Sequence, residues 1–396
     1  MSQGGTFQID SFFTFESRQE SRGDYYRQTD TADLGDHARL QCGKTVERAV
    51  KSILRQTLQE FELIMIDDGS VDGTQDLCRQ IQAAAPDMVR VCRQENAGPA
   101  AARNRGLEAA RGSLVCFVDA DDTVRPDFLQ VMADHIGDAG MAVCGYRTIE
   151  EGSPAASGSP SDEESAAGHA GAESANQGEF PAGTESANPG EVPADEEPAA
   201  GSPVDEESSA ALVCTVSGPA AMRLAVTDEA FGGYLWNRIF RRDLIEQAGI
   251  RFEPGIHVGE DLLFVERYLT QCETVCILDR PLYDYYCAAG SISHAMSRKN
   301  LTLLRALEKI LPLSGDPEFA GIMAVRYTRQ FLAFYPYFPK EKKLKGRLDR
   351  YLRKTGLSGS QVFSRLSRDY KVRYILYRTS PALYTLSMRA GRGLSR

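Results

Sequence analysis

The sequence predicts an α/β protein with a doubly wound, mostly parallel sheet, a disordered acidic insertion and a helical, basic C-terminal region. Short apolar runs at residues 61–66 and 114–118 are typical of buried strands in a parallel sheet. They alternate with segments such as residues 45–58, in which apolar residues recur at helical spacing. Both runs lead directly into aspartates. In open α/β sheets, ligands bind beyond the carboxyl ends of the strands.

The length and composition favour a large globular protein with a sizeable core. The chain has 396 residues, of which 42% are hydrophobic. It has no apolar run of the roughly 18 residues that a membrane span needs. Its first residues lack the basic start and apolar stretch of a signal peptide. Nine cysteines without Cys-x-x-Cys pairs favour reduced thiols, so we expect a cytoplasmic protein.

The negative net charge of the chain belongs to one segment. Residues 151–211 carry 14 acidic residues and no Lys or Arg, and the remaining chain has a formal charge of +4. This segment is rich in Ala, Gly, Ser, Pro and Glu, and residues 173–182 recur in altered form at 185–194. It cannot bury enough apolar area to offset the entropy of ordering, so we expect it to be disordered.

The remaining sequence divides into four parts. Residues 1–41 are atypical and are expected to be poorly ordered, residues 42–150 and 212–300 form two halves of one α/β domain, and residues 301–396 are helical. Strands are expected at residues 61–66, 89–92, 114–118, 141–144 and 275–278. Helices are expected at residues 45–58, from Asp72 as the N-cap, at 100–110, from Pro126 and from Glu260.

Three acidic groups follow strands or begin helices: Asp67 with Asp68, Asp119 with Asp121, and Glu260 with Asp261. We expect the first two groups to lie side by side at one edge of the sheet. Crowded carboxylates repel one another unless a cation or a proton separates them. Mg²⁺ and Mn²⁺ prefer such oxygen ligands, usually one or two carboxylates together with phosphates. Acidic, solvated turns are the alternative interpretation.

Five ordered motifs carry a resemblance to a known family. They are Ile66-Asp-Asp-Gly-Ser-Val-Asp-Gly-Thr74, the stretch from Asn96 to Leu107, Phe117-Val-Asp-Ala-Asp-Asp122, Trp236-Asn-Arg-Ile-Phe240 and Gly259-Glu-Asp261. Together they resemble the family 2 glycosyltransferases of GT-A fold. The resemblance implies transfer of a sugar from a nucleotide-sugar donor, a UDP-sugar, with a divalent metal and inversion at the anomeric carbon. It also implies a saccharide or lipid-linked acceptor in surface polysaccharide or glycan synthesis.

Position in these motifs implies a role for each acid. Asp68, with Asp67 beside it, resembles the residue that contacts the nucleotide base, and Asp119 the residue near the ribose. Asp121, together with Asp119, resembles the ligand of Mn²⁺ or Mg²⁺ on the diphosphate. Asp261 resembles the general base. The chemistry agrees, because a metal stabilises the charge of the leaving group while a carboxylate takes the proton of the acceptor hydroxyl.

Four further side chains have a functional and a plain interpretation. Arg103 adds charge near the phosphates or lies on the surface of a helix. Trp236, on the acceptor side with Glu260, forms an acceptor platform or packs in the core. His294 approaches the metal or belongs to an ordinary loop.

The N-terminal segment departs from the family pattern. The family begins with an apolar strand and a Pro-x-Tyr-Asn-like turn, and residues 3–41 contain no such strand. A displaced start of the coding sequence is one explanation, and a replacement strand at residues 7–15 is another. Because the missing strand forms one wall of the nucleotide pocket, nucleotide affinity depends on which explanation holds.

Two other functions compete with glycosyl transfer. A sugar-phosphate nucleotidyltransferase would need a Gly-rich, basic phosphate loop near the first strand, and the sequence has none. A catalytically impaired protein that binds sugar nucleotides, or a scaffold, is the non-enzymatic alternative.

The C-terminal region is strongly basic. Residues 340–396 contain 16 Lys or Arg and three acids, interleaved with tyrosines. We expect peripheral docking on an anionic membrane surface at its inner face, with a solvated helical face as the alternative. No base-reading module accompanies the charge, so nucleic acid is not an expected partner.

Overall fold

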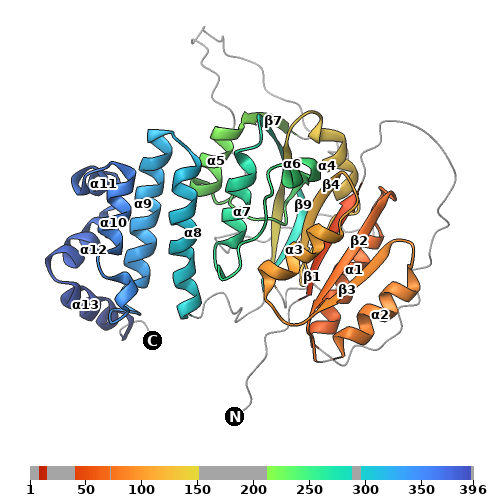
Figure 1. Ribbon diagram of the computed structural model, residues 1–396, viewed down its shortest axis with the longest axis horizontal. Coiled ribbons are helices and arrows are strands. Elements are labelled where there is room, and N and C mark those ends of the chain that lie inside the picture. Colours follow the sequence, from red (N-terminus) through yellow and green to blue (C-terminus); the bar gives the residue numbers. More distant parts are fainter. Residues whose placement is uncertain (1–8, 16–40, 72, 151–211, 288–295, 394–396) are drawn as a thin grey trace, which may run out of the picture.

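The computed structural model describes residues 9–15, 41–71, 73–150, 212–287 and 296–393. Within these residues a single sheet lies next to a helical region formed by the C-terminal part of the chain (Figure 1). The sheet has the order β3-β2-β1-β4-β8-β6-β9-β5, and β7 pairs with β9. Its strands are β1 (Ile9–Phe15), β2 (Phe61–Asp68), β3 (Val89–Gln94), β4 (Leu114–Asp119), β5 (Thr123–Val124), β6 (Met141–Glu150), β7 (Leu212–Ser217), β8 (Arg238–Arg241) and β9 (Thr274–Cys287).

The helices fall into two groups. The helices that pack against the sheet, or connect its strands, are α1 (Gln41–Leu54), α2 (Thr74–Ala84), α3 (Pro99–Ala109), α4 (Phe128–Ile136), α5 (Gly218–Thr227), α6 (Arg242–Gln247) and α7 (Glu260–Leu269). The helices of the C-terminal region are α8 (Thr302–Ile310), α9 (Pro317–Phe334), α10 (Arg347–Thr355), α11 (Gly359–Arg365), α12 (Arg368–Thr379) and α13 (Pro381–Gly393).

The α/β class is confirmed, but the expectation of a mostly parallel sheet is wrong. In the described residues only β2–β3 and β6–β9 pair in parallel. The five strands that the sequence predicts, β2, β3, β4, β6 and β9, do run in one direction. Antiparallel strands separate them, with β1 between β2 and β4 and β8 between β4 and β6. The sheet is therefore mixed.

Strand β1 fills the position of the missing first strand. Ile9–Phe15 pairs antiparallel with β2 on one side and with β4 on the other. This is the replacement strand that the second explanation of the N-terminal segment anticipates. The backbone groups of β2 and β4 that face β1 are thereby paired, as the centre of a sheet requires.

Alternating side chains of the central strands feed two cores. Ile64, Ile66, Val115 and Phe117 face one core, with α3, α5 and α7, and this core continues into α8–α12. Leu63, Met65 and Cys116 are among the residues that face the other core, with α1, α2 and α4. Because successive residues of a strand point to opposite faces, the unbroken apolar runs of β2 and β4 are explained by burial on both faces.

Three expectations fall outside the described residues. They concern disorder of residues 151–211, the capping role of Asp72 and the position of His294.

Candidate active site

The acids of β2 and β4 lie at the same edge of the sheet, with one strand between them. Asp67 is in register with Ile9 of β1, and Asp119 is in register with the next residue, Asp10. Adjacent strands are about 4.8 Å apart, so the two strand ends are roughly 10 Å apart. The expected shared edge is found, although the two groups are not direct neighbours.

Asp68 organises the loop that leads into α3. Its Oδ1 accepts hydrogen bonds from Gln94 Nε2 at 2.9 Å and from the Ala97 amide at 2.8 Å. Its Oδ2 accepts from the Gly98 amide at 2.8 Å. A carboxylate has about four lone-pair sites. Two bonds of Asp68 therefore hold the start of α3 against β2, and the third holds the Gln94 side chain at the end of β3.

Asp67 and Gly69 shape the turn after β2. Asp67 Oδ1 accepts from the Ser70 amide at 2.8 Å, and its Oδ2 lies 3.5 Å from Arg93 Nε. Gly69 has a φ of +77°, and a Cβ there would lie 2.8 Å from the Asn96 amide nitrogen. An open hollow of about 510 Å³ lies beside this turn and is lined by Gly69, Arg93, Gln94, Glu95 and Asn96.

Arg103 is the cation that joins the acidic groups. Its Nη1 lies 2.5 Å from Asp261 Oδ1 and 3.3 Å from Glu260 Oε1, and its Nη2 lies 3.9 Å from Asp119 Oδ1. Arg103 is only 7% exposed, and its guanidinium lies over the ring of Phe252. The interpretation of Arg103 as a surface residue is wrong, because α3 turns it inward toward the start of α7. A guanidinium thus lies among three carboxylates, of which the sequence analysis assigns Asp119 to the metal site, Asp261 to the general base and Glu260 to the acceptor side.

The environment raises the pKa values of two of these acids. Burial, opposed by the Arg103 charge, raises the pKa of Asp261 to about 7, and the Glu260 charge acts in the same direction as burial. Burial raises the pKa of Asp119 to about 6, again opposed by Arg103. The Asp261 side chain remains 31% exposed. An accessible carboxylate with a pKa near neutrality has the properties of a general base.

The third acid of the Asp119-Ala-Asp-Asp122 motif has a structural role that the sequence analysis missed. Asp122 is buried, accepts a hydrogen bond from the Tyr283 hydroxyl at 2.7 Å and another from the Tyr286 amide at 2.8 Å. Burial and the nearby Asp119 raise its pKa to about 8. The same Tyr283 hydroxyl accepts from the Asp119 amide at 3.2 Å. These bonds fix the end of β4 against β9. The sequence signal for this role was the presence of a third acid, Asp122, directly after Asp119 and Asp121.

Asp121 lies at the exposed tip of this turn. Its backbone oxygen accepts a hydrogen bond from the Arg48 guanidinium, which in turn lies 3.6 Å from the centre of the Tyr286 ring. Helix α1 thereby contacts the turn that carries the candidate metal ligand. The sequence analysis assigned no role to Arg48, because only the fold brings it to residue 121.

Trp236 packs within an aromatic cluster. It is 7% exposed and stacks on Tyr234, Tyr283 and Tyr285, with ring centroids 4.9, 4.6 and 5.5 Å away. Core packing, the plain interpretation, accounts for this position. Glu260 contacts Arg103, and an acceptor-side role for either residue stays a prediction.

The donor atoms at the end of β4 suit a hard divalent cation. Asp119 and Asp121 offer carboxylate oxygens, the ligands that Mg²⁺ and Mn²⁺ prefer. The described residues contain no group of three or more His, Cys, Asp or Glu placed to hold a metal ion. Mg²⁺ commonly takes one or two carboxylates from a protein and its other ligands from phosphates and water, so Asp119 and Asp121 fit such a site.

Comparison with known proteins finds similarity to glycosyltransferases. Residues 40–173 match the profile described as "Glycosyl transferase family 2". The uncharacterized glycosyltransferase YibD of Escherichia coli is 26% identical over 277 residues, which are 68% of this chain and 66% of YibD. The putative teichuronic acid biosynthesis glycosyltransferase TuaG of Bacillus subtilis is 35% identical over 112 residues, which are 28% of this chain and 44% of TuaG. The chain thus spans part of the length of each relative.

The fold is also similar to that of a solved structure. The crystal structure of residues 1–349 of Staphylococcus aureus TarS in complex with UDP-GlcNAc superposes with a TM-score of 0.58 at 17% identity. The superposition covers 88% of this chain and 89% of the TarS chain. At this identity the likeness establishes a shared architecture.

Proposed function

We propose that this chain, which carries a family 2 glycosyltransferase domain of GT-A fold, transfers a sugar from a UDP-sugar to a saccharide or lipid-linked acceptor. The observation that carries the proposal is the set of three carboxylates around Arg103 at the carboxyl edge of the sheet. TuaG, named for teichuronic acid biosynthesis, supports a role in surface polysaccharide synthesis. TarS, solved with UDP-GlcNAc, supports a UDP-sugar donor.

In the proposed reaction Asp261 acts as the general base. Its carboxylate takes the proton of the acceptor hydroxyl as that oxygen attacks the anomeric carbon. The new oxygen–carbon bond forms on the face opposite the nucleotide, so the configuration is inverted. The bond between the anomeric carbon and the phosphate oxygen breaks, and its electron pair leaves with the nucleoside diphosphate. Arg103 holds Asp261 in place and supplies positive charge near that leaving group.

The nucleotide is proposed to bind at the turn after β2. The hollow beside Gly69 supports this position, since Asp67 and Asp68 hold its walls through the loop from Gln94 to Gly98. This arrangement gives the two acids an organising role in the pocket. Direct contact of Asp68 with the base remains part of the proposal. The Asp68 carboxylate accepts three hydrogen bonds from the protein, and a carboxylate has about four lone-pair sites, which leaves one for the nucleotide.

Asp121, assisted by Asp119, is proposed to hold Mn²⁺ or Mg²⁺. When bound, such an ion would neutralise the charge that develops on the diphosphate. The chain's own residues support the position, because Arg48 fixes the backbone of Asp121 and Tyr283 fixes that of Asp119.

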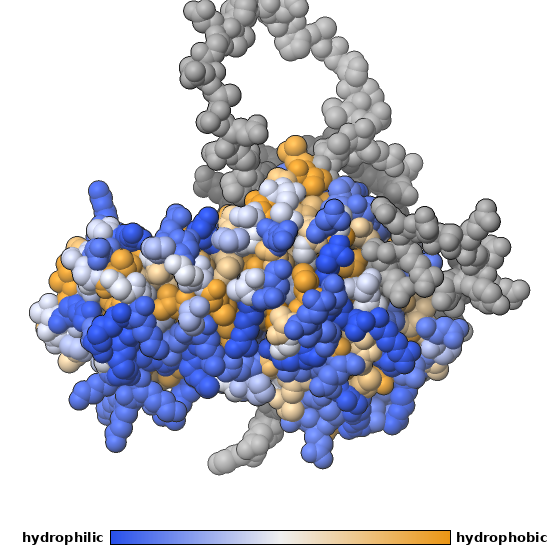
Figure 2. All heavy atoms as spheres, turned by 45° about the horizontal axis from the view of Figure 1, so that its top comes forward, coloured by the Kyte–Doolittle hydropathy of each residue, from blue (hydrophilic) through white to orange (hydrophobic). Residues whose placement is uncertain are grey.

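The helical region is proposed to dock on the inner face of an anionic membrane, where lipid-linked acceptors would reside. No helix in the described part of the chain has both the length and the apolarity to cross a bilayer. The support for surface docking is a patch of exposed aliphatic residues on the outer faces of α12 and α13, formed by Val372, Ile375, Leu383 and Leu386. Figure 2 shows hydrophobic residues side by side with hydrophilic ones on this end of the molecule.

Two outcomes of one assay separate the proposed function from its alternatives. The protein is incubated with a panel of UDP-sugars and Mn²⁺, and release of UDP is followed with and without candidate acceptors. Slow hydrolysis that Asp261→Asn abolishes is expected for a glycosyltransferase. Binding of UDP-sugars in a thermal shift assay without any turnover would instead favour the impaired sugar-nucleotide-binding protein.

A further inference from the structure

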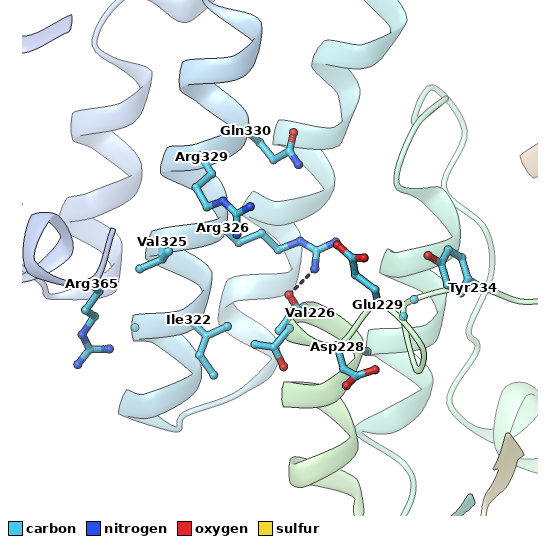
Figure 3. A pocket seen from close by; sticks show the side chains of 15 residues that line it. Val226, Asp228, Glu229, Tyr234, Ile322, Val325, Arg326, Arg329, Gln330 and Arg365 are labelled. Atoms are coloured by element: carbon cyan, nitrogen blue, oxygen red, sulfur yellow. Dashed lines mark hydrogen bonds between the residues drawn. The ribbon is translucent and has the colours of Figure 1, made fainter. Parts of the chain in front are cut away.

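A second cavity lies between the loop that follows α5 and the helix α9 (Figure 3). Its volume is about 490 Å³. Its walls come from three parts of the chain: the end of α5 with its loop, α9 and α11. Its charged lining residues are Asp228, Glu229, Arg326, Arg329 and Arg365, and Tyr234 and Gln330 are among the lining residues that can form hydrogen bonds.

One wall of the cavity is rich in arginine. Arg326, Arg329 and Gln330 are three and four residues apart, so they lie on one face of α9. Arg365, from α11, packs its guanidinium against Gly321 on the same helix. Arg326 donates a hydrogen bond to the Val226 carbonyl and thereby joins α9 to the end of α5. Arg329 is exposed, with its guanidinium over the ring of Tyr370.

The two outer arginines are better placed for a ligand than Arg326. Burial lowers the pKa of Arg326 and raises that of Glu266 well above its usual range, and the two charges attract one another. Arg326 donates its hydrogen bond to the Val226 carbonyl, so its guanidinium is already used within the protein. Arg329 and Arg365 lie on the exposed rim. Planar guanidinium groups bind phosphates and carboxylates through paired hydrogen bonds.

The opposite wall offers groups that suit sugar hydroxyls. Asp228 Oδ1 already accepts a hydrogen bond from the Phe231 amide at 2.8 Å and so closes the turn of the loop. Glu229 and Tyr234 follow on the same loop and point toward α9 in Figure 3. A carboxylate accepts hydrogen bonds from hydroxyl groups, and a tyrosine offers both an apolar ring face and a hydroxyl.

The cavity is one loop away from the candidate base. A Cβ on Gly233, the neighbour of Tyr234, would lie 2.3 Å from Leu262 Cδ1, and Leu262 directly follows Asp261. The Tyr234 ring also stacks on Trp236, which stacks on Tyr283 of β9. The same loop therefore contacts the cavity on one side and the start of α7 on the other.

We propose that this cavity is an acceptor subsite for a saccharide that carries a phosphate or carboxylate group. The inference rests on the proposed function, because it concerns the substrate that meets Asp261. Arg329 binds one anionic group and Arg365, which packs beside Gly321 about two turns away along α9, binds another. Glu229 and Tyr234 bind hydroxyls and the face of a sugar ring. A polymer or lipid-linked glycan with regularly spaced anionic groups would span from this subsite to the base.

The chain contains a built-in reporter for the test. Trp236 is its only tryptophan, and the adjacent Tyr234 lines the cavity. Tryptophan fluorescence is followed while the full-length protein is titrated with glucose, glucuronate or glucose 6-phosphate, with UDP present throughout. The two charged sugars distinguish a carboxylate from a phosphate as the preferred group. A response to one of them at a much lower concentration than to glucose is expected.

Two variants and a control test whether the fluorescence response to charged sugars depends on the arginines of the cavity rim. Arg329→Gln and Arg365→Gln are each expected to weaken binding of the charged sugar by about tenfold, the effect of losing one charge-assisted hydrogen bond. Arg353→Gln, an exposed arginine of α10 outside the cavity, is the matched control and should bind as the wild type. Equal affinity for all three sugars, or charged-sugar binding unaffected in both rim variants, would overturn the proposal.

Parallel assays keep the two proposals separate. UDP affinity and UDP-sugar turnover are measured on the same wild-type preparation. UDP binding and turnover without any response to charged sugars would remove the subsite and leave the transferase. A response to charged sugars that depends on Arg329, with no turnover of any UDP-sugar, would remove the transferase and leave a charged-saccharide site.

Discussion

Arg103 Nη1 and Asp261 Oδ1 are 2.5 Å apart, although 157 residues of sequence separate them. The contact joins α3, which Asp68 anchors to the end of β2, to the first turn of α7. Arg103 also draws Glu260 and Asp119 toward the same point. One buried cation therefore links the proposed nucleotide half and the proposed acceptor half of the site.

The pH dependence of transfer should follow Asp261. Its pKa is raised to about 7, and only the deprotonated carboxylate accepts the acceptor proton. The transfer rate is therefore expected to rise as the pH increases through about 7 and then to level off. Rates with saturating donor between about pH 5.5 and 9 test this. A rate that is constant across this range would contradict the assignment of Asp261 as the base.

Removal of the Arg103 charge should shift the pH dependence of the transfer rate. The guanidinium opposes the rise in the Asp261 pKa, so Arg103→Gln raises this pKa further. We expect the midpoint of the profile to move to higher pH by about 1 or more. Arg105→Gln, on the same helix but in an exposed pair with Glu108, is the control and should leave the midpoint unchanged. An unchanged midpoint in Arg103→Gln would show that the contact with Arg103 does not determine the pKa of the general base.

Substitutions of Asp121 and Asp261 should affect different steps, donor binding and transfer respectively. Asp121→Asn removes a charged ligand from the proposed metal site, so Mn²⁺ and UDP-sugar affinities should fall together, by at least about tenfold. Asp261→Asn should keep donor affinity and lose transfer, because the base acts on the acceptor. Calorimetric titration of Mn²⁺ and UDP, beside acceptor-dependent UDP release, separates the two. Loss of donor affinity in Asp261→Asn alone would reverse the assignment.

Local patterns predicted the strands that carry the acids, because β2 and β4 are apolar on both faces and need no distant partner to be recognised. The antiparallel strands are different. Strand β8 has the sequence Arg-Ile-Phe-Arg, and only its partners β4 and β6 make it a strand. Arg103 shows the same limit for the site. Its motif placed it near the phosphates, whereas the fold decides that it turns toward Glu260 and Asp261.

The turn after β2 should require glycine at position 69. A side chain there meets both a positive φ and the Asn96 backbone, so Gly69→Ala should cost about 1–3 kcal/mol and disturb the loop that Asp68 holds. Gly249→Ala is the matched control, because its φ is also positive but a Cβ there meets nothing within 4 Å. Thermal unfolding and UDP affinity are measured for both. If Gly69→Ala binds UDP with wild-type affinity, this turn does not contribute to nucleotide binding.

Membrane docking should depend on the aliphatic patch of α12 and α13. Val372 is 58% and Leu386 is 65% exposed, whereas Tyr374 and Tyr384 on the inner faces are buried. Polar substitutions on the patch should therefore spare the fold. Lys and Arg exceed acids by 13 in residues 340–396, and each basic residue near an anionic bilayer contributes on the order of 1 kcal/mol.

Co-sedimentation with vesicles tests this docking surface. We expect the protein to pellet with vesicles that contain an anionic lipid and not with neutral ones, and to be released by high salt, since salt screens surface charge. Replacement of Val372, Ile375, Leu383 and Leu386 by Ser should abolish pelleting, because apolar anchoring is lost while the charge remains. Val71→Ser, at an exposed aliphatic residue on the loop after β2, is the control. Equal pelleting with both lipids, or undiminished pelleting of the fourfold variant, would exclude this surface.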